Sequence, residues 1–565
     1  MCGLSRFTGE RRFWRKAWMA ERTGIRPYML LCLLCFALYA PGLAAIPPLD
    51  RDEARFAQAT RQMLETGDFV RVRFQHESRN KKPAGIYWLQ AVAVSAFSSP
   101  ESTAIWPYRL PSALGAAAAV LLTFSFGTRL LGSPQAGLVA AVLTATALGV
   151  VVEAHLAKTD AALLAAVVAG QGALGRVYVG TRGGWRISCS VPLVFWCAEG
   201  VAILLKGPPG PLLALLTVTC LSVADRDVRW LSGLRPLAGI FVIALIVTPW
   251  LVAVENATAG RFIFDAVSND LLPKLVGAQE SHGAPPGYHL ALAIACFWPG
   301  SLFAIPAILW GWRQRRTPAQ RFLLAWLVPA WIFFELVPTK LPHYVLPLYP
   351  AIALLGGGAL AEGFAQHLAG WARFCDRGVR LIWVVVTIAL ATALVALPGR
   401  FGGTVSPAGN GAALLLVGLA LLLLFRECQP MTVAGLVAAL AATFVVPAAI
   451  EVAPELSSLW LSRSAATLLA RYPPAPGEAV LSVGYSEPSL VFLVGTATRL
   501  VTAAPANDQL AGAGMALVNN RFDAEFLQSL ASRKLAARAL GSVEGLDYSS
   551  GGGKLMLTLY RLEPG

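Results

Sequence analysis

The chain contains about thirteen separate apolar stretches, each close to 20 residues long. A helix needs about 20 apolar residues to cross a bilayer, and it satisfies its backbone polar groups internally. The sequence therefore predicts a polytopic α-helical membrane protein with about 13 transmembrane helices. They are expected near residues 28–46, 108–128, 134–152, 160–179, 187–205, 208–224, 233–254, 288–311, 320–337, 343–363, 380–397, 411–425 and 430–450.

The composition excludes most other classes of protein. Hydrophobic residues make up 56% of the 565 residues and charged residues only 14%, against about 45–50% and about 25% in soluble domains. Disordered and collagen-like chains do not have this composition. The net charge of +14 would suggest nucleic acid in a soluble protein, but in a membrane protein it indicates basic cytoplasmic loops.

Basic residues predict the orientation of the chain. Seven of them precede the first apolar stretch, which makes residues 1–27 a cytoplasmic N-terminus. Every second loop repeats the signal, so an odd number of spans places the C-terminus on the far side. The basic residues of these loops are Arg176, Arg182, Arg186, Arg226, Arg229, Arg235, Arg313, Arg315, Arg316, Arg321, Arg373, Arg377 and Arg380.

Two regions outside the membrane are long enough to be folded. Residues 47–105 form a large first external loop, with an amphipathic stretch at 53–64 and an aromatic apolar one at 86–97. Both are expected to be short helices on the membrane surface. Residues 451–565 are more polar, with strand-like runs at 479–483, 515–519 and 554–561 and a helical stretch at 523–535. They predict a small external α/β domain.

Charged residues gather at the outer ends of the predicted spans. The segment Asp50-Arg51-Asp52-Glu53-Ala54-Arg55-Phe56 directly follows the first span. Alone, it is best explained as a solvated surface. However, three further groups of residues are predicted on the same side of the membrane. They are Lys81-Lys82-Pro83 with Tyr87-Trp88, Asp160, and Lys340-Leu341-Pro342-His343-Tyr344. Acids and bases collected at one membrane face are typical of a site.

These residues, in this order, resemble motifs of the GT-C glycosyltransferases. The run 52–56 with Met63-Leu64 and Gly67-Asp68-Phe69 is similar to the first external loop of the aminoarabinose transferase (ArnT) and the protein O-mannosyltransferases. Lys82-Pro83 resembles the lysine-proline element of that loop. The run 340–347 resembles a late lysine-leucine-proline motif of the ArnT-like branch. The likeness covers residues 28–365, and for the rest only the layout.

The resemblance implies a GT-C catalytic domain at 28–450 and a sugar donor linked to polyprenyl phosphate. Transfer is then expected on the periplasmic face of a bacterial inner membrane, to a lipid or glycan acceptor such as lipid A. Breaking a sugar–phosphate bond requires cations that stabilise the departing phosphate. The candidates for this role are Arg55, Lys82, Lys340 and Lys81.

An attacking acceptor hydroxyl also needs a general base, for which a carboxylate is suited. Asp52 is the first candidate, followed by Glu53 and Asp160, and a single displacement would invert the anomeric carbon. An acceptor that is itself a phosphate would need less help from a base. Further candidates for substrate contacts are Tyr87, His343 and Tyr344.

One position departs from the family pattern. The aminoarabinose transferase has a glutamate that helps to hold a metal where this chain has Lys81. A lysine cannot replace that ligand, so no metal is expected by that route. A divalent metal is left open, with His282 and His343 as candidate ligands. The change also weakens the expectation of lipid A as acceptor.

Two alternatives remain at this point. The first is an enzyme resembling the protein O-mannosyltransferases, against which the late lysine-leucine-proline motif favours the ArnT-like branch. The second is a lipid or sugar transporter or flippase. Transporters often contain internal repeats and broken helices near the membrane midplane. This sequence has no evident repeat, and its charged groups gather at one surface.

Overall fold

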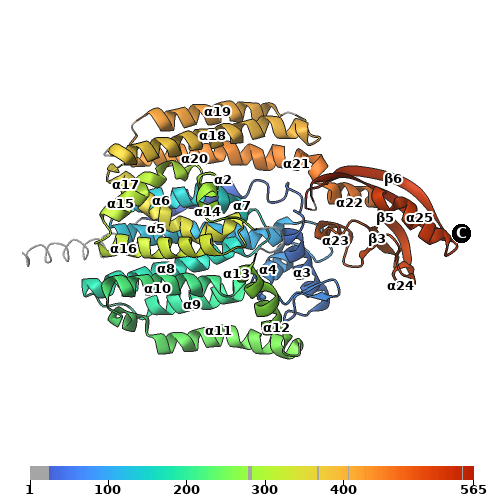
Figure 1. The fold of residues 1–565 in the computed structure, drawn as a ribbon, viewed down its shortest axis with the longest axis horizontal. Helices are drawn as coiled ribbons and strands as arrows, with labels where there is room; N and C mark the ends of the chain where they lie inside the picture. Colours follow the sequence, from blue (N-terminus) through green and yellow to red (C-terminus); the bar gives the residue numbers. More distant parts are fainter. Residues whose placement is uncertain are drawn as a thin grey trace, which may run out of the picture.

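The computed structural model describes residues 24–564 except 278–282, 365–367, 405, 427 and 550. It is a helical bundle followed by a small domain that lies beyond one end of the bundle (Figure 1). The elements of the bundle, in chain order, are α2 (Ile25–Tyr39), α3 (Asp52–Thr66), β1 (Arg73–Phe74), β2 (Glu77–Ser78), α4 (Gly85–Phe97), α5 (Trp106–Leu131), α6 (Pro134–Thr146), α7 (Leu148–Ala154), α8 (Asp160–Gly183), α9 (Ser190–Lys206), α10 (Pro209–Asp225), η1 (Arg229–Leu234), α11 (Pro236–Ala257), α12 (Arg261–Phe264), η2 (Asp265–Leu271), α13 (Leu272–Val276), α14 (Tyr288–Cys296), η3 (Gly300–Phe303), α15 (Ala304–Arg313), α16 (Pro318–Leu336), η4 (Pro342–Leu348), α17 (Tyr349–Ala361), α18 (Gly370–Arg400), α19 (Pro407–Phe425), α20 (Pro430–Pro447), η6 (Ala448–Val452), α21 (Ala453–Glu455) and η7 (Ser457–Leu459).

The predicted fold class is confirmed, but the count of 13 spans is not. Within the described residues, eight helices are long and apolar enough to cross a membrane, or up to ten if each of two bent pairs counts as one span. The bent pairs are α6 with α7, at 59°, and α14 with 300–313, at 115°. Three further predicted spans coincide with α2, α9 and α10, which have only 15, 17 and 17 residues.

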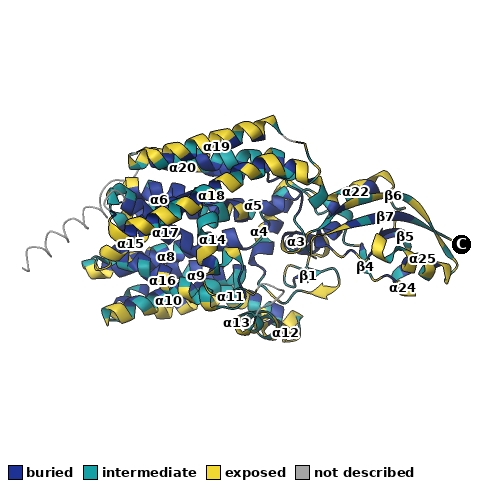
Figure 2. Ribbon diagram, turned by 45° about the horizontal axis from the view of Figure 1, so that its top comes forward, coloured by how far each residue is buried: buried dark blue, intermediate teal, exposed yellow. Residues whose placement is uncertain are grey.

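The bundle is built around two central spans. In its most apolar window, α8 is 78% buried, and the span of η4 and α17 is 83% buried, whereas α11 is only 17% buried. Figure 2 shows the corresponding exposed surfaces on peripheral helices such as α19. Those surfaces are apolar, for example at Leu237 (86% exposed) and Leu414 (78%). Apolar side chains on the outside of a helix bundle face lipid.

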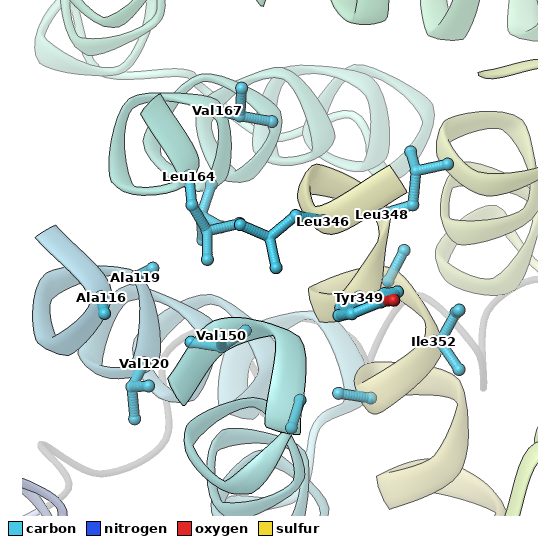
Figure 3. Packing of buried hydrophobic residues seen from close by; sticks show 14 of the residues in the cluster. Ala116, Ala119, Val120, Val150, Leu164, Val167, Leu346, Leu348, Tyr349 and Ile352 are labelled. Atoms are coloured by element: carbon cyan, nitrogen blue, oxygen red, sulfur yellow. The ribbon is translucent and has the colours of Figure 1, made fainter. Parts of the chain in front are cut away.

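The central packing fixes the helix ends that carry the charged residues. Figure 3 shows Leu164 of α8 beside Leu346 of η4, with Val150 of α7 and Val120 of α5 packed nearby. All four are buried. Protein interiors are close-packed, so helices joined in this way are held in a fixed relative position.

Residues 47–105, the predicted first external loop, contain two short helices, α3 and α4, where short helices were expected. Helix α3 is longer than the predicted stretch at both ends, and Gly67 (φ +69°) closes it in the left-handed conformation. Ten of its fifteen residues are buried, because the helix lies between the bundle and the C-terminal domain (Figure 1). It is therefore a packed structural element rather than a helix that simply floats on the membrane surface.

The C-terminal domain comprises α22 (Leu461–Arg471), β3 (Ala479–Val483), α23 (Pro488–Val494), β4 (Arg499–Val501), α24 (Asn507–Leu510), β5 (Ala513–Asn519), η8 (Asn520–Phe522), α25 (Asp523–Ala531), β6 (Leu535–Asp547) and β7 (Gly553–Pro564). The strand order is β4-β3-β5-β7-β6. Strands β4, β3 and β5 are parallel, and β7 and β6 are antiparallel to their neighbours. The three predicted strands are present. The predicted helix at 523–535 ends earlier, at Ala531, because the chain turns into the long strand β6.

Candidate active site

The carboxylate of Asp52 lies at the first residue of α3. The preceding residue, Arg51, has φ +61°, a conformation that non-glycine residues seldom adopt. Asp52 is exposed, and the charges of Lys82, Lys158, Arg79 and Arg55 act on it. Partial burial by itself would raise the pKa of Asp52, but these four cations hold that pKa below its usual range. Asp52 is therefore ionised at neutral pH, as a general base must be.

Glu53, the next residue, is placed quite differently. Its carboxylate accepts hydrogen bonds from Arg109 Nε (2.8 Å), Arg109 Nη2 (2.9 Å), Leu49 N (2.9 Å) and Ala157 N (2.9 Å). The Glu53 and Arg109 side chains are 1% and 0% exposed. All four bonds go to protein groups, so the geometry of Glu53 is that of a structural link between the first loop and the 155–159 segment.

A second group of charges surrounds Asp160 at the start of α8. Asp160 pairs with Lys206 at the end of α9, and His343 Nε2 lies 3.8 Å from Asp160 Oδ1. The other ring nitrogen of His343 lies 3.6 Å from Glu153 Oε1, which in turn accepts a hydrogen bond of 3.1 Å from Lys158. We call Asp52, Lys82, Glu153, Lys158, Asp160, Lys206 and His343 the ionic cluster.

Lys82 connects the first loop to this group. Its ammonium is close enough to Lys206, Asp160 and Asp52 for their charges to affect it. Burial, together with the nearby Lys206, lowers the pKa of Lys82 to about 8, against the opposing charges of Asp160 and Asp52. Conversely, the pKa of Lys158 is raised, because Glu153 and Asp160 outweigh its burial. The predicted association of Asp52, Lys82, Asp160 and His343 therefore agrees with the geometry.

Aromatic rings form one wall beneath the cations. Lys82 Nζ lies 5.7 Å and Arg79 Cζ 5.3 Å from the centre of the Phe56 ring, which stacks on Tyr87 at 5.2 Å. Cations at this distance over a ring are attracted by its π electrons. Tyr344 has the same relation to Lys206, whose Nζ is 5.8 Å from the ring centre. Tyr87 is 1% exposed, so it supports Phe56 from below.

Three predicted residues lie away from the ionic cluster or outside the described part. Lys340 is 3% exposed and donates a hydrogen bond of 2.6 Å to the Val337 carbonyl. Lys81 is exposed. His282 falls outside the described residues. Within residues 24–564 and their described ranges, no three His, Cys, Asp or Glu side chains are grouped closely enough to hold a metal ion.

Sequence reasoning did not select Glu153 and Lys206 of the ionic cluster, and it missed three further polar residues. Arg79 has a buried Nη1 atom that lacks a hydrogen-bond partner among the described residues, and it acts on Asp52. Lys158 lies two residues before Asp160 in the chain and is not among the predicted site residues. Arg109 could have been found, because a lone arginine at the start of an apolar helix needs a buried partner. Nothing in the sequence signals Arg79, which lies in a polar loop.

The comparisons with known proteins agree with this geometry. Residues 29–263 match the family described as dolichyl-phosphate-mannose-protein mannosyltransferase. The chain is 29% identical over 340 residues to the undecaprenyl phosphate-alpha-4-amino-4-deoxy-L-arabinose arabinosyl transferase 1 of Pseudomonas fluorescens, covering 59% of this chain and 60% of the relative. It is 30% identical over 339 residues to the corresponding transferase of Pseudomonas paraeruginosa, with 58% and 60% covered. The chain thus matches about three fifths of the length of these relatives.

Solved structures extend the likeness to the whole fold. The crystal structure of ArnT from Cupriavidus metallidurans bound to undecaprenyl phosphate superimposes with a TM-score of 0.71 and 19% identity, covering 95% of this chain and 98% of that one. The oligosaccharyltransferase of Archaeoglobus fulgidus gives a TM-score of 0.54 and 13% identity, over 89% and 70% of the two chains. The chain therefore shares its fold with ArnT, as the motifs predicted.

Proposed function

We propose that this protein is a membrane glycosyltransferase that moves a sugar from a polyprenyl-phosphate carrier to a lipid or glycan acceptor, with inversion. The observation that carries the proposal is the ionic cluster. It contains an ionised carboxylate, Asp52. With the neighbouring Arg55 and Arg79, its three lysines make five cations against three carboxylates. The buried Nη1 of Arg79, which has no hydrogen-bond partner within the described residues, is a donor available to an incoming anion. A phosphate beside a base is what glycosyl transfer from a lipid phosphate requires.

The surroundings of Lys82 suit an amphipathic donor. Helix α4 begins at Gly85, three residues after Lys82, and exposes Leu89 (46%) and Val92 (69%). A hollow lies against this helix, lined by Phe69, Trp88, Ala91, Val92, Ser95 and Ala96. A polyprenyl phosphate has the same division into an apolar chain and an anionic head. The proposal therefore places the phosphate at Lys82 and the chain along α4.

The chemistry follows from these positions. The bond between the anomeric carbon and the phosphate oxygen breaks, and its electron pair stays on the phosphate. Lys82, Arg79 and Arg55 stabilise that charge by charge-assisted hydrogen bonds. The acceptor oxygen bonds to the opposite face of the anomeric carbon, and its proton passes to Asp52. Asp160, held by Lys206, orients the acceptor.

We also propose five secondary contacts to the substrates. They are Lys340, Lys81, His343, Tyr87 and Tyr344. His343 bridges Glu153 and Asp160, and so we assign it the task of keeping the two carboxylates in place. Lys81 is exposed and can meet the acceptor or the lipid surface. A bound divalent metal is not needed for any of the steps above.

The acceptor is proposed by class only. The curated relatives are named for transfer of aminoarabinose from undecaprenyl phosphate, which supports a related donor and a lipid acceptor such as lipid A. The matched family model is named for transfer of mannose to protein, which keeps a protein acceptor as the second candidate. We further propose a bacterial inner membrane location, with the N-terminus cytoplasmic and the C-terminal domain periplasmic.

The test is transfer by the purified full-length protein from a panel of mass-tagged polyprenyl-phosphate sugars. Wild type is compared with Asp52→Asn and Lys82→Ala, and mass spectrometry identifies the acceptor. Product from wild type that both variants fail to make supports the proposal. If no donor turns over while the protein moves lipid or sugar across vesicles, it is a transporter. Full activity of both variants would locate the chemistry elsewhere in the chain.

A further inference from the structure

The two residues that precede Asp52 are held by the C-terminal domain. Asp50 N donates a hydrogen bond of 2.9 Å to the Tyr548 hydroxyl, and the Asp50 carboxylate accepts one from Ser489. The Arg51 guanidinium donates to the Ser549 carbonyl. Ser489 belongs to α23, while Tyr548 and Ser549 belong to the turn between β6 and β7. Two separate parts of the domain therefore converge on one dipeptide.

These contacts rest on a rigid support. The Ser489 hydroxyl lies 2.6 Å from that of Ser462, which lies 2.8 Å from the Tyr485 hydroxyl. All three side chains are at least 95% buried. Polar groups buried in a satisfied network hold one geometry, because losing a partner leaves a buried group unpaired. The contact to Asp50 is thus backed by the core of the C-terminal domain.

The C-terminal domain also contacts α3 further along the helix, at Arg61. Arg61 Nη1 donates a hydrogen bond of 2.8 Å to the Phe492 carbonyl of α23, and the Phe492 ring packs edge-on against Tyr108 at 5.3 Å. Helix α3 is thereby fixed along its length as well as at its start. Its first residue, Asp52, follows the unusual conformation of Arg51 (φ +61°), which persists only where neighbouring contacts hold it.

We propose that the C-terminal domain positions the base of the reaction, with Ser489, Tyr548 and the 548–549 turn acting as a clamp on Asp50 and Arg51. The inference rests on the proposed function, since it assigns the clamp its role through Asp52. Ser489 and Tyr548 are positioning residues, because the contacts described above reach the dipeptide 50–51 rather than the ionic cluster. The domain is then part of the active enzyme and not only an appendage.

The clamp contains a group that titrates near neutral pH. Burial raises the pKa of Asp50 to about 7; the hydrogen bonds from Ser489 and Tyr548 oppose this, and the charges of Glu487 and Asp547 add to it. Below about pH 7, Asp50 is protonated and is not repelled by Glu487 and Asp547. Above about pH 7, Asp50 is ionised, and we expect its repulsion by these two acids to loosen the clamp. The other ionisable groups that face this region are Tyr485, Tyr548, Arg51 and Arg55.

The first test compares kcat and the donor KM of wild type, Ser489→Ala, Tyr548→Phe and the double variant. We expect kcat of the double variant to fall by about tenfold to a hundredfold, because small displacements of a reacting group have effects of this size. The donor KM should stay within about twofold, since the phosphate contacts are untouched. Tyr472→Phe is the matched control, because Tyr472 is 41% exposed. Unchanged kcat, or a change confined to KM, would overturn the proposal.

The second test uses Asp50→Asn. The amide oxygen still accepts a hydrogen bond from Ser489 but cannot ionise. Wild-type kcat should decline as pH rises through about 7, and this decline should be absent in the variant. A merely structural loss would lower kcat at every pH and leave the shape of the profile unchanged. The same decline in both proteins would overturn the titration of Asp50 within the clamp.

The third test does not depend on turnover. Hydrogen exchange of the full-length protein is followed in peptides covering 47–56. Exchange there should become faster in the Ser489→Ala/Tyr548→Phe double variant than in wild type or Tyr472→Phe. If the wild-type protein transfers no sugar but exchange is still faster in the double variant, the clamp is upheld while the proposed function fails. Equal exchange in all three proteins would refute the clamp whatever the activity.

Discussion

A buried carboxylate with cationic neighbours lies beside each end of helix α8, in two different arrangements. Beside its C-terminal end, the carboxylate of Asp225, the last residue of α10, accepts bonds from Arg182 (2.8 Å), Arg321 and the Tyr178 hydroxyl (2.7 Å). At its start, Asp160 lies in the ionic cluster, where His343 stands 3.8 Å away and further cations lie nearby. The first arrangement is a structural link in which donors from α8 and α16 take up the carboxylate of α10; we call it the staple. The second is open to an additional anion.

The difference lies in how the charges are matched. Asp225 is 2% exposed in its side chain, and its acceptors are taken up by three protein donors. Around Asp52 and Asp160, the nearby cations include Lys82, Lys158 and Lys206, besides Arg55 and Arg79. Preorganised cations without a full complement of acids are how a protein stabilises a charge that arrives or develops later. The comparison supports the proposal that the reaction takes place at the end where cations outnumber acids.

The largest effect should come from Asp52→Asn. Removing the general base should lower kcat by about a hundredfold to ten-thousandfold, measured by transfer from the polyprenyl-phosphate sugar. The matched control is Asp225→Asn, which removes the charge of the α10 carboxylate beside the other end of α8 and should leave kcat near wild type. If the acceptor is a phosphate, the loss in Asp52→Asn will be smaller. Equal losses of kcat in Asp52→Asn and Asp225→Asn would contradict the assignment of catalysis to one end of α8 only.

Glu53→Gln should instead destabilise the protein. Breaking a buried ion pair leaves Arg109 with an uncompensated charge, at a cost of about 3–5 kcal/mol. We expect a clearly lower melting temperature in detergent, with kcat per folded molecule much less affected than in Asp52→Asn. A variant with wild-type melting and abolished kcat would return Glu53 to the list of candidate bases.

Arg79→Ala should weaken donor binding. A hydrogen bond to a charged group contributes about 1.5–3 kcal/mol, so the donor KM should rise by roughly tenfold to a hundredfold. Arg73→Ala is a suitable control, because Arg73 lies in the same loop and its nearest carboxylate is Asp68, at 3.7 Å. A donor KM that is the same in the two variants would remove Arg79 from the phosphate site.

Asp225→Asn should have a modest effect on stability. Arg182 and Arg321 are about one third exposed, so water can solvate them when the acid is lost. The expected destabilisation is about 1–3 kcal/mol, visible as a small fall in melting temperature. A large fall in activity at unchanged stability would contradict the assignment of this end as a staple.

The smallest effect is a pH dependence. The pKa of Lys82 is lowered to about 8, so the ammonium loses its proton as pH rises through that value. The donor KM should therefore increase severalfold between pH 7 and 9. Lys82→Arg keeps its charge throughout this range and should show a flatter profile. An increase of the same size in that variant would assign the effect to another group.

Much of the fold was predictable because hydropathy acts locally. Apolar runs identified the helices of the bundle, and short strand-like runs in the more polar tail identified β3, β5 and β7. The long strand β6 was not predicted, since its extent is set by pairing with β7 rather than by composition. Asp52 and Lys82 were selected with the help of a family resemblance, and Asp160 because it is an acid at the predicted outer start of a span.

The sequence by itself determined that this chain spans a membrane and that its acids and bases collect at one end of the bundle. Only the tertiary structure decided which of two adjacent carboxylates is free for chemistry. Asp52 stays exposed beside cations, whereas Glu53 turns into the protein toward Arg109, 56 residues away. Side chains at neighbouring positions of a helix point about 100° apart, so a helix that is packed on several sides gives them different surroundings. The role of the C-terminal domain also depends on the structure, because residues 439 positions apart meet at Asp50.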